Sequence, residues 1–117
     1  MNYKGSCHCG DVAYEVEVEG DPGEAMECNC SYCSSKGYLL WFAPRDKLRV
    51  TKGEGSLSTY TFNKHVIEHK FCPRCGCGLF GFAKDPKGNL TAAINARCIE
   101  GVDPLKLKRK FFDGAGK

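Results

Sequence analysis

Hydrophobic and polar residues alternate along several short stretches of this chain. The clearest is VAYEVEVE, residues 12–19, in which three valines and Tyr14 share one face while glutamates occupy the other. A period of two residues predicts a strand that is half buried. The next segment, GDPG at residues 20–23, has the composition of a turn and is expected to end this strand.

A second kind of stretch is continuously apolar. YLLWFA, residues 38–43, has no alternation and is rich in aromatic residues, which predicts a strand buried on both faces. Shorter patterns predict further strands at residues 48–50, 57–62, 66–71, 78–83 and 90–96, with turns at 51–56 and 85–89.

Helix signals are few. The best candidate is Ser31 to Lys36, with Ser31 as the N-cap and Gly37 as the residue that ends the helix. Many short strands separated by turns predict a mainly β domain, either a sandwich or a folded-over sheet.

The chain has 117 residues, which suits a single domain over residues 1–117. Nine cysteines are unusual at this length and indicate either disulfides or metal binding. The first ten residues, MNYKGSCHCG, lack the apolar region of a secretion signal, and no apolar run is long enough to span a membrane. We therefore expect a cytoplasmic protein, in which disulfides rarely persist. Because the cysteine count is also odd, metal binding is the better hypothesis.

Charge gives little reason to expect a nucleic acid partner. The formal net charge is +3, from 17 Lys+Arg and 14 Asp+Glu. Each ligating thiol loses its proton, so a zinc ion with four thiolates carries about −2 and one with three thiolates about −1. Two such sites would bring the net charge of the protein to about zero. The first 30 residues are acidic, so the rest of the chain is basic and could favour an anionic ligand.

Seven of the nine cysteines fall into three tight clusters: Cys7 and Cys9, then Cys28, Cys30 and Cys33, then Cys72 and Cys75. In CPRCG the two thiols are separated by two residues and followed by Gly76, which is the pattern of a metal knuckle. One knuckle supplies two of four zinc ligands. The natural second pair is Cys7 with Cys9, which also ends in a glycine. We therefore predict a structural zinc held by these two pairs.

The cluster at Cys28, Cys30 and Cys33 is then left with three thiols. Three protein ligands and one open position are typical of a catalytic zinc. The alternative is a closed second site, with Cys77, Cys98 or a histidine as the fourth ligand. The sequence leaves both possibilities open.

For the two remaining cysteines and for two of the histidines we expect roles other than direct metal binding. We expect Cys77 to pack or stay free, and Cys98 to be a small core residue. His69 is expected to pack near the knuckle or to orient a ligand, and His8 to point away from the metal.

The order GSCHCG, CNCSYCSSKG, HKFCPRCGCGLF and INARCIEGVDP resembles the glutathione-dependent formaldehyde-activating enzyme family, whose relatives include centromere protein V. The resemblance covers roughly Lys4 to Leu105. It implies a β-tent fold, in which small antiparallel sheets lean together over zinc. It also implies two zinc ions per chain, one structural and one with an open position, on the two sets of cysteines named above.

The same resemblance implies a function. The family's named activity joins glutathione and formaldehyde to form S-hydroxymethylglutathione, which places it among carbon–sulfur lyases. The expected partners are a small thiol such as glutathione and a small aldehyde. Cys77 departs from the family pattern, in which a small or hydroxylated residue is more usual.

A second hypothesis is a non-catalytic zinc module that binds glutathione or a macromolecular partner. The basic segment KLKRKFF, residues 106–112, is the feature that could contact an acidic partner. A simpler interpretation is a solvated C-terminal segment whose Phe111 and Phe112 cover the core, and we expect this one.

Overall fold

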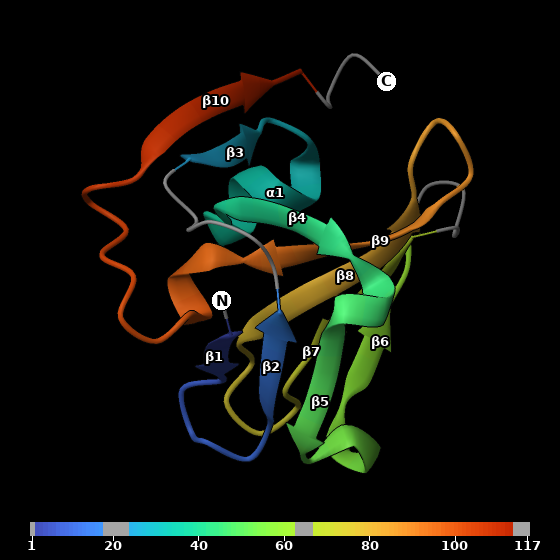
Figure 1. Cartoon of the computed structure of the whole chain (residues 1–117), viewed down its shortest axis with the longest axis vertical. Coiled ribbons are helices and arrows are strands. Elements are labelled where there is room, and N and C mark those ends of the chain that lie inside the picture. Colours follow the sequence, from blue (N-terminus) through green and yellow to red (C-terminus); the bar gives the residue numbers. More distant parts are fainter. Residues whose placement is uncertain (1, 18–23, 63–66, 114–117) are drawn as a thin grey trace.

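A computed structural model of the chain describes residues 2–17, 24–62 and 67–113 (Figure 1). Within these residues the chain forms two β-sheets, one short α-helix and three short 3-10 turns. The prediction of a mainly β protein with little helix is therefore confirmed.

The first sheet contains β1 (Asn2–Ser6), β2 (Ala13–Glu17) and β5 (Leu48–Lys52), in the order β1-β2-β5, and both pairings are antiparallel. The alternation predicted for β2 is confirmed, because Tyr14 and Val16 are buried while Glu17 is exposed. Val18, Glu19 and the GDPG turn lie outside the described residues.

The second sheet has the strand order β10-β3-β4-β9-β8-β7-β6. Its strands are β3 (Glu24–Cys28), β4 (Leu40–Pro44), β6 (Ser58–Tyr60), β7 (Glu68–Phe71), β8 (Gly78–Lys84), β9 (Leu90–Asn95) and β10 (Lys108–Phe112). Pairing is antiparallel except between β10 and β3, which run parallel. The expectation of antiparallel sheets therefore holds for every described pairing except the one between β10 and β3.

The apolar run at residues 38–43 is not buried on both faces, so that prediction was wrong. Ala43 is buried in β4, but Phe42 beside it is 46% exposed. Because successive side chains of a strand point to opposite faces, β4 packs one face on the core and leaves the other to solvent. Phe42 instead lines a shallow surface hollow with Leu90.

The helix α1 (Ser31–Lys36) has the predicted range, but its N-cap is Cys30, not Ser31. The Cys30 Sγ atom accepts a hydrogen bond from the Cys33 backbone N–H at 3.4 Å. At the other end Gly37 has φ 69°, the left-handed conformation that glycine adopts most readily, and it ends the helix as predicted.

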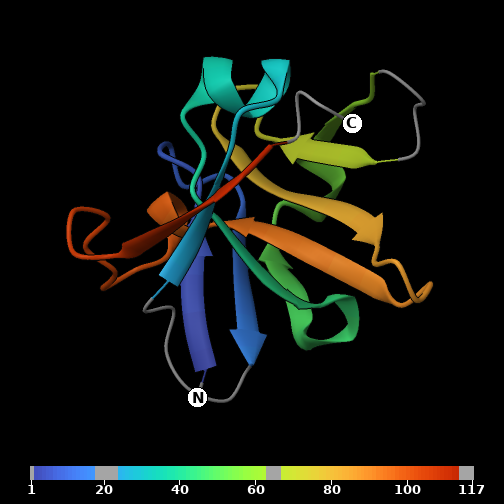
Figure 2. The same ribbon diagram turned by 90° about the horizontal axis from the view of Figure 1, so that it is seen from above.

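The C-terminal segment forms a strand that the sequence pattern did not reveal. β10 pairs with β3 at the edge of the second sheet. Figure 1 shows the two strands side by side, and in Figure 2, which is seen from above, they overlap. Phe111 is 79% exposed and Phe112 is 41% exposed, so the expectation that they cover the core was wrong. Side chains of a strand point to the two faces of its sheet, and the described residues leave all five residues of β10 exposed.

The core lies between the two sheets. Tyr14 of β2 packs edge-on against Phe80 of β8, with ring centroids 5.4 Å apart and planes at 87°. Cys7 and Cys72 belong to the same buried cluster, so one group of thiols sits at the edge of the core. Among the described residues, no helix is long and apolar enough to cross a membrane.

Candidate metal centres

The first cluster brings together the two pairs of cysteines that the sequence analysis had combined. Cys7 and Cys9 follow β1, while Cys72 and Cys75 follow β7. The four Sγ atoms lie within 4.8 Å of one another. Cys9 Sγ is 3.6 Å from both Cys7 Sγ and Cys72 Sγ. Four thiols gathered in this way are suited to one metal ion.

Backbone hydrogen bonds shape both loops of this cluster. In the first loop the Cys7 N–H donates to the Val12 carbonyl at 3.0 Å, and the Val12 N–H donates back to Cys7 Sγ at 3.4 Å. In the second the Gly76 N–H donates to the Cys72 carbonyl at 2.8 Å. Gly76 has φ 78°, which confirms why a glycine follows the knuckle.

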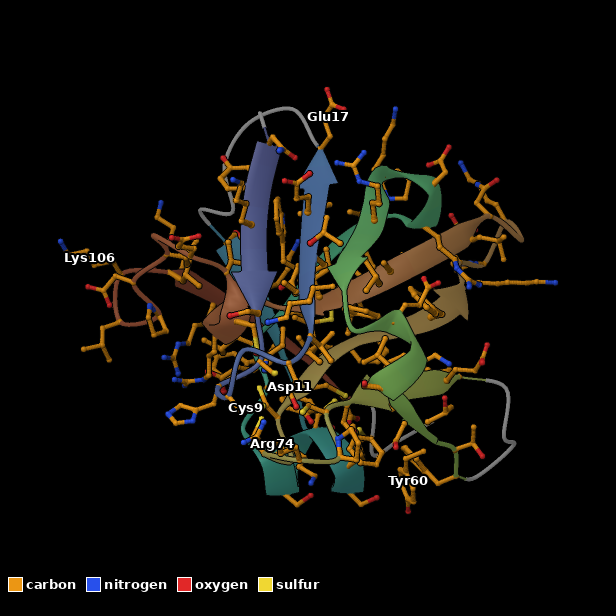
Figure 3. All side chains as sticks on the ribbon, turned by 90° about the horizontal axis from the view of Figure 1, so that it is seen from below. Cys9, Asp11, Glu17, Tyr60, Arg74 and Lys106 are labelled. Carbon is orange, nitrogen blue, oxygen red and sulfur yellow. The ribbon has the colours of Figure 1, made fainter. Side chains whose placement is uncertain are left out.

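An ion pair also connects the two loops. Arg74 Nη1 lies 3.3 Å from Asp11 Oδ1 at the surface, beside Cys9 (Figure 3). Backbone N–H groups of Cys9 and Cys77 donate to Cys75 and lower its pKa to about 6. The loop therefore favours the thiolate form of Cys75, which is the form that binds metals.

The second cluster lies where β3 leads into α1. The Sγ atoms of Cys28, Cys30 and Cys33 lie within 4.8 Å of one another. Cys33 is buried, and the other two are half-buried. The strand β10 flanks this turn, because the Asn29 N–H donates to the Phe112 carbonyl at 3.2 Å.

These three thiols differ in acidity. Burial opposes ionisation of Cys30, but hydrogen bonds from the Cys33 backbone and from the neighbouring thiols together lower its pKa. Burial raises the pKa of Cys28 and of Cys33. A thiolate at Cys30 therefore forms first, and its negative charge opposes ionisation of the other two until a cation is present.

No fourth protein ligand joins this cluster from the described parts of the chain. No further Cys, His, Asp or Glu belongs to the group. Cys77 and Cys98 lie instead against each other, with Sγ atoms 3.4 Å apart. Both are half-buried, and Cys98 lies outside the buried core cluster, so the expectation that it is a small core residue was wrong.

The described histidines also stay out of both groups. His69 packs against the Tyr32 ring, with centroids 4.2 Å apart, which agrees with the packing role expected for it. His8 is exposed, as expected for a side chain that points away from the metal. His65 lies outside the described residues.

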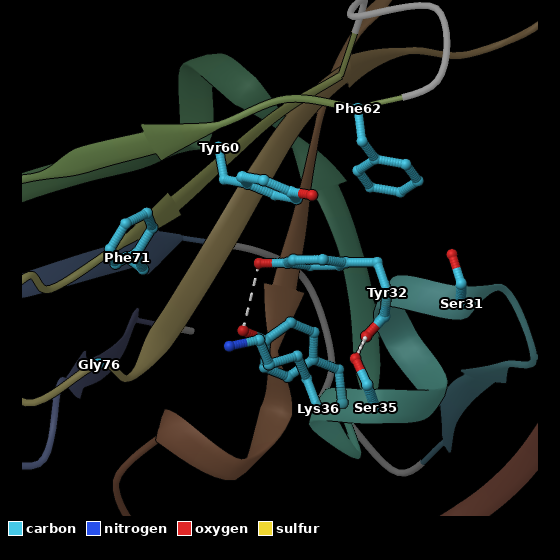
Figure 4. A pocket seen from close by; sticks show the side chains of 9 residues that line it. Ser31, Tyr32, Ser35, Lys36, Tyr60, Phe62, Phe71 and Gly76 are labelled. Atoms are coloured by element: carbon cyan, nitrogen blue, oxygen red, sulfur yellow. Dashed lines mark hydrogen bonds between the residues drawn. The ribbon is translucent and has the colours of Figure 1, made fainter.

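A pocket of about 410 Å³ lies beside α1 (Figure 4). Its lining residues are Ser31, Tyr32, Ser35, Lys36, Tyr38, Tyr60, Phe62, Phe71 and Gly76. Tyr32 is central to it. Its ring stacks on Tyr60 and Phe62, and its hydroxyl lies 3.4 Å from that of Tyr38.

Sequence reasoning missed this pocket. The signal was the alternation in LSTYTF, which predicts Tyr60 and Phe62 on one face of a strand, although β6 ends at Tyr60. The partners on α1 come from a different part of the chain. Gly76 brings the loop of the first cluster to the same pocket, so the pocket touches the loops of both clusters.

Comparison with known proteins agrees with this arrangement. The family model described as "Glutathione-dependent formaldehyde-activating enzyme" matches residues 2–112. The chain belongs to this family. The match spans both clusters of thiols and β10, so the features described above lie within the family domain.

The chain is similar to one protein compared by sequence and to another compared by structure. A Halomonas elongata protein named "Putative glutathione-dependent formaldehyde-activating enzyme" is 32% identical over 95 residues, or 74% of this chain and 59% of that protein. The chain thus spans less than two thirds of that relative. The crystal structure of a Rhodobacter sphaeroides protein superposes with a TM-score of 0.79 at 31% identity, covering 92% of this chain and 99% of the other.

Proposed function

We propose that both clusters bind zinc. A zinc ion bound to four thiolates at about 2.3 Å requires sulfur atoms roughly 3.8 Å apart. The sulfur–sulfur distances of 3.6 Å around Cys9 are close to that requirement. The three thiols of the second cluster, Cys28, Cys30 and Cys33, also offer only soft sulfur ligands, which suit zinc better than magnesium or calcium.

The two sites would differ in role. The first has four thiols from two distant segments and would act as a structural cross-link. The second has three thiols, and the described residues add no fourth ligand. That single observation carries the functional proposal, because a zinc with an open position can accept a substrate.

The proposed reaction joins glutathione and formaldehyde to S-hydroxymethylglutathione, or splits that adduct in the reverse direction. The glutathione sulfur bonds to the aldehyde carbon as the second bond of the carbonyl group breaks. The electron pair of that bond moves to the oxygen, which takes up the proton lost by the thiol and becomes a hydroxyl group. When bound, zinc would supply a Lewis acid that stabilises a substrate thiolate at neutral pH. Membership of the family, and the name of the Halomonas relative, support this substrate pair.

This chain's own residues would prepare the site. Cys30, with its lowered pKa, would be the first ligand to ionise, and Cys28 and Cys33 would complete the thiolate set. The backbone N–H groups of Cys30 and Cys33 donate to Cys28 Sγ and Cys30 Sγ, which orients two of the three sulfurs before a metal arrives.

The test must measure acceleration, because thiols also add to formaldehyde without a catalyst. Exchange NMR between glutathione and its adduct would compare zinc-loaded protein, the Cys30→Ser variant and no protein. We expect the wild type to accelerate exchange and Cys30→Ser to do so no better than buffer. Ser34→Ala, an exposed change on the same helix, is the matched control. Absence of acceleration at every protein concentration refutes the proposal for this substrate.

A second candidate is a non-catalytic zinc module, and the exposed edge strand β10 favours it. Lys108 and Phe111 are exposed there, at the free edge of the second sheet, where an acidic extended peptide could pair. Cobalt-substituted protein separates an open metal site that takes glutathione from a module that binds only a peptide at β10. A change in the visible spectrum on adding glutathione supports the open site, whereas an unchanged spectrum supports the module.

A further inference from the structure

Two cysteines outside both metal clusters lie in contact. Cys77 immediately precedes β8, and Cys98 ends the 3-10 turn Ala96–Cys98 that follows β9. Their Sγ atoms are 3.4 Å apart. Neither belongs to a group of three or more possible metal ligands among the described residues. A pair of thiols with no third ligand suits covalent chemistry between the two sulfurs better than metal binding.

The backbone positions these sulfurs firmly. β8 and β9 pair antiparallel from Phe80↔Ile94 onward, so the two cysteines lie at the same end of one hairpin. The Gly78 carbonyl oxygen lies within reach of both thiols, 3.8 Å from Cys77 Sγ and 3.6 Å from Cys98 Sγ. The same oxygen accepts a hydrogen bond from the buried Asn95 Nδ2 at 2.9 Å, which fixes this part of the backbone.

A small oxidant can reach the pair. Cys77 and Cys98 are half-buried and line an open hollow of about 760 Å³. The hollow therefore gives a small polar oxidant such as a peroxide access to both thiols.

We propose that Cys77 and Cys98 form a reversible intramolecular disulfide when hydrogen peroxide oxidises them. One thiol attacks the peroxide, the oxygen–oxygen bond breaks, and water leaves as a sulfenic acid forms. The second thiol then displaces the hydroxyl group as a second water, and the sulfur–sulfur bond forms. Two thiols lose two electrons and two protons, and one peroxide becomes two waters. A low-molecular-weight thiol reverses the step by thiol–disulfide exchange.

The sulfurs must approach by about 1.4 Å to reach a disulfide length near 2.05 Å. That movement is small enough to be shared between the two side chains. The bond would tie the residue before β8 to the turn after β9 and close a loop with a sequence separation of 21. It would form beside the knuckle of the first cluster without using any thiol of either cluster.

The experiment uses the full, zinc-loaded chain. Protein is treated with one equivalent of hydrogen peroxide, alkylated, digested with trypsin and analysed by mass spectrometry, while released zinc is followed with a chromogenic chelator. Trypsin would yield peptides 75–84 and 98–106, so a linked pair identifies the bond, and fragmentation tells Cys77 from Cys75. We expect a Cys77–Cys98 link, two hydrogens lost, and zinc retained.

Variants and thermal unfolding complete the test. The bond should raise the melting temperature by up to about 10 °C, and dithiothreitol should abolish the rise. Cys77→Ser and Cys98→Ser should each lose both the link and the rise. The proposal is overturned if Cys77 and Cys98 stay alkylatable while zinc is released. It is equally overturned if Cys98 links to Cys75, or if the pair over-oxidises without linking.

Discussion

The Sγ atoms of Cys9 and Cys72 lie 3.6 Å apart, although 63 positions separate the two residues in the chain. A metal ion at this point would connect the loop after β1 to the loop after β7, and so connect the first sheet to the second. A metal ion at the second cluster would not connect distant segments of the chain, because Cys28, Cys30 and Cys33 lie within one short segment.

This difference predicts unequal effects of two mutations. Cys72→Ser should unfold the domain or lower its melting temperature by more than roughly 15 °C, because metal binding there is coupled to folding. Cys30→Ser should lose one metal ion and keep the fold. Circular dichroism melts with metal analysis of each variant check this. Equal thermal losses in the two variants would contradict the division of roles.

A second prediction concerns the close approach of Gly5 to Tyr14. A Cβ atom at position 5 would collide with the Tyr14 ring and hydroxyl, and Tyr14 is only 1% exposed and cannot move aside. Gly5→Ala should therefore cost about 1–3 kcal/mol of unfolding free energy. Gly55→Ala is the control, because nothing lies within 4 Å of its added Cβ. Urea titration of both variants should show the loss at position 5 alone.

A third prediction concerns pH. Burial lowers the pKa of His69 in the folded state, so the unfolded chain binds this proton more readily. The contribution of neutral His69 is complete above the unfolded value of about 6.5 and is lost as the pH falls through the lower folded pKa. Stability should therefore decline on acidification, through protonation of a ring that packs against Tyr32 and stacks on Phe62.

The variant His69→Phe keeps an aromatic ring at this place and removes the titration. Unfolding free energies from urea at pH 7.5, 6.5 and 5.5 should fall less steeply in this variant than in the wild type. His8→Gln, at an exposed position, should retain the wild-type slope. An unchanged slope in His69→Phe would exclude His69 as the source.

A fourth prediction contrasts two large apolar side chains. Ile94 in β9 is fully buried, and Ile94→Ala should cost about 2–5 kcal/mol. Phe111 in β10 is 79% exposed, and Phe111→Ser should stay within about 0.5 kcal/mol of the wild type. Thermal and urea unfolding check both values. A large loss at Phe111 would mean that a contact beyond the described residues covers it.

Local patterns predicted much of this protein. The period of two in β2, the glycine after Cys75 and the glycine that ends α1 each reflect a preference that neighbouring residues impose, so the sequence reveals them directly. The pairing of Cys7 and Cys9 with Cys72 and Cys75 was also predictable, because one knuckle leaves a zinc ion two ligands short.

Other features depend on which segments meet. Nothing in KLKRKFF distinguishes an edge strand beside β3 from a tail that covers the core, because the pairing partner lies more than 80 residues away in the chain. The aromatic pocket needs α1 to lie against Tyr60, Phe62 and Phe71. The contact of Cys77 with Cys98 needs the β8–β9 register.

The sequence by itself therefore determined the β character of the chain and the grouping of its clustered thiols. The tertiary structure decided which face of β4 is exposed, where β10 lies, and that Cys77 and Cys98 lie together, away from the three thiols near α1. The physical reason is that periodicity and turn preferences act over a few residues. Contacts between distant segments are set by the packing of the whole core and the register of the sheet.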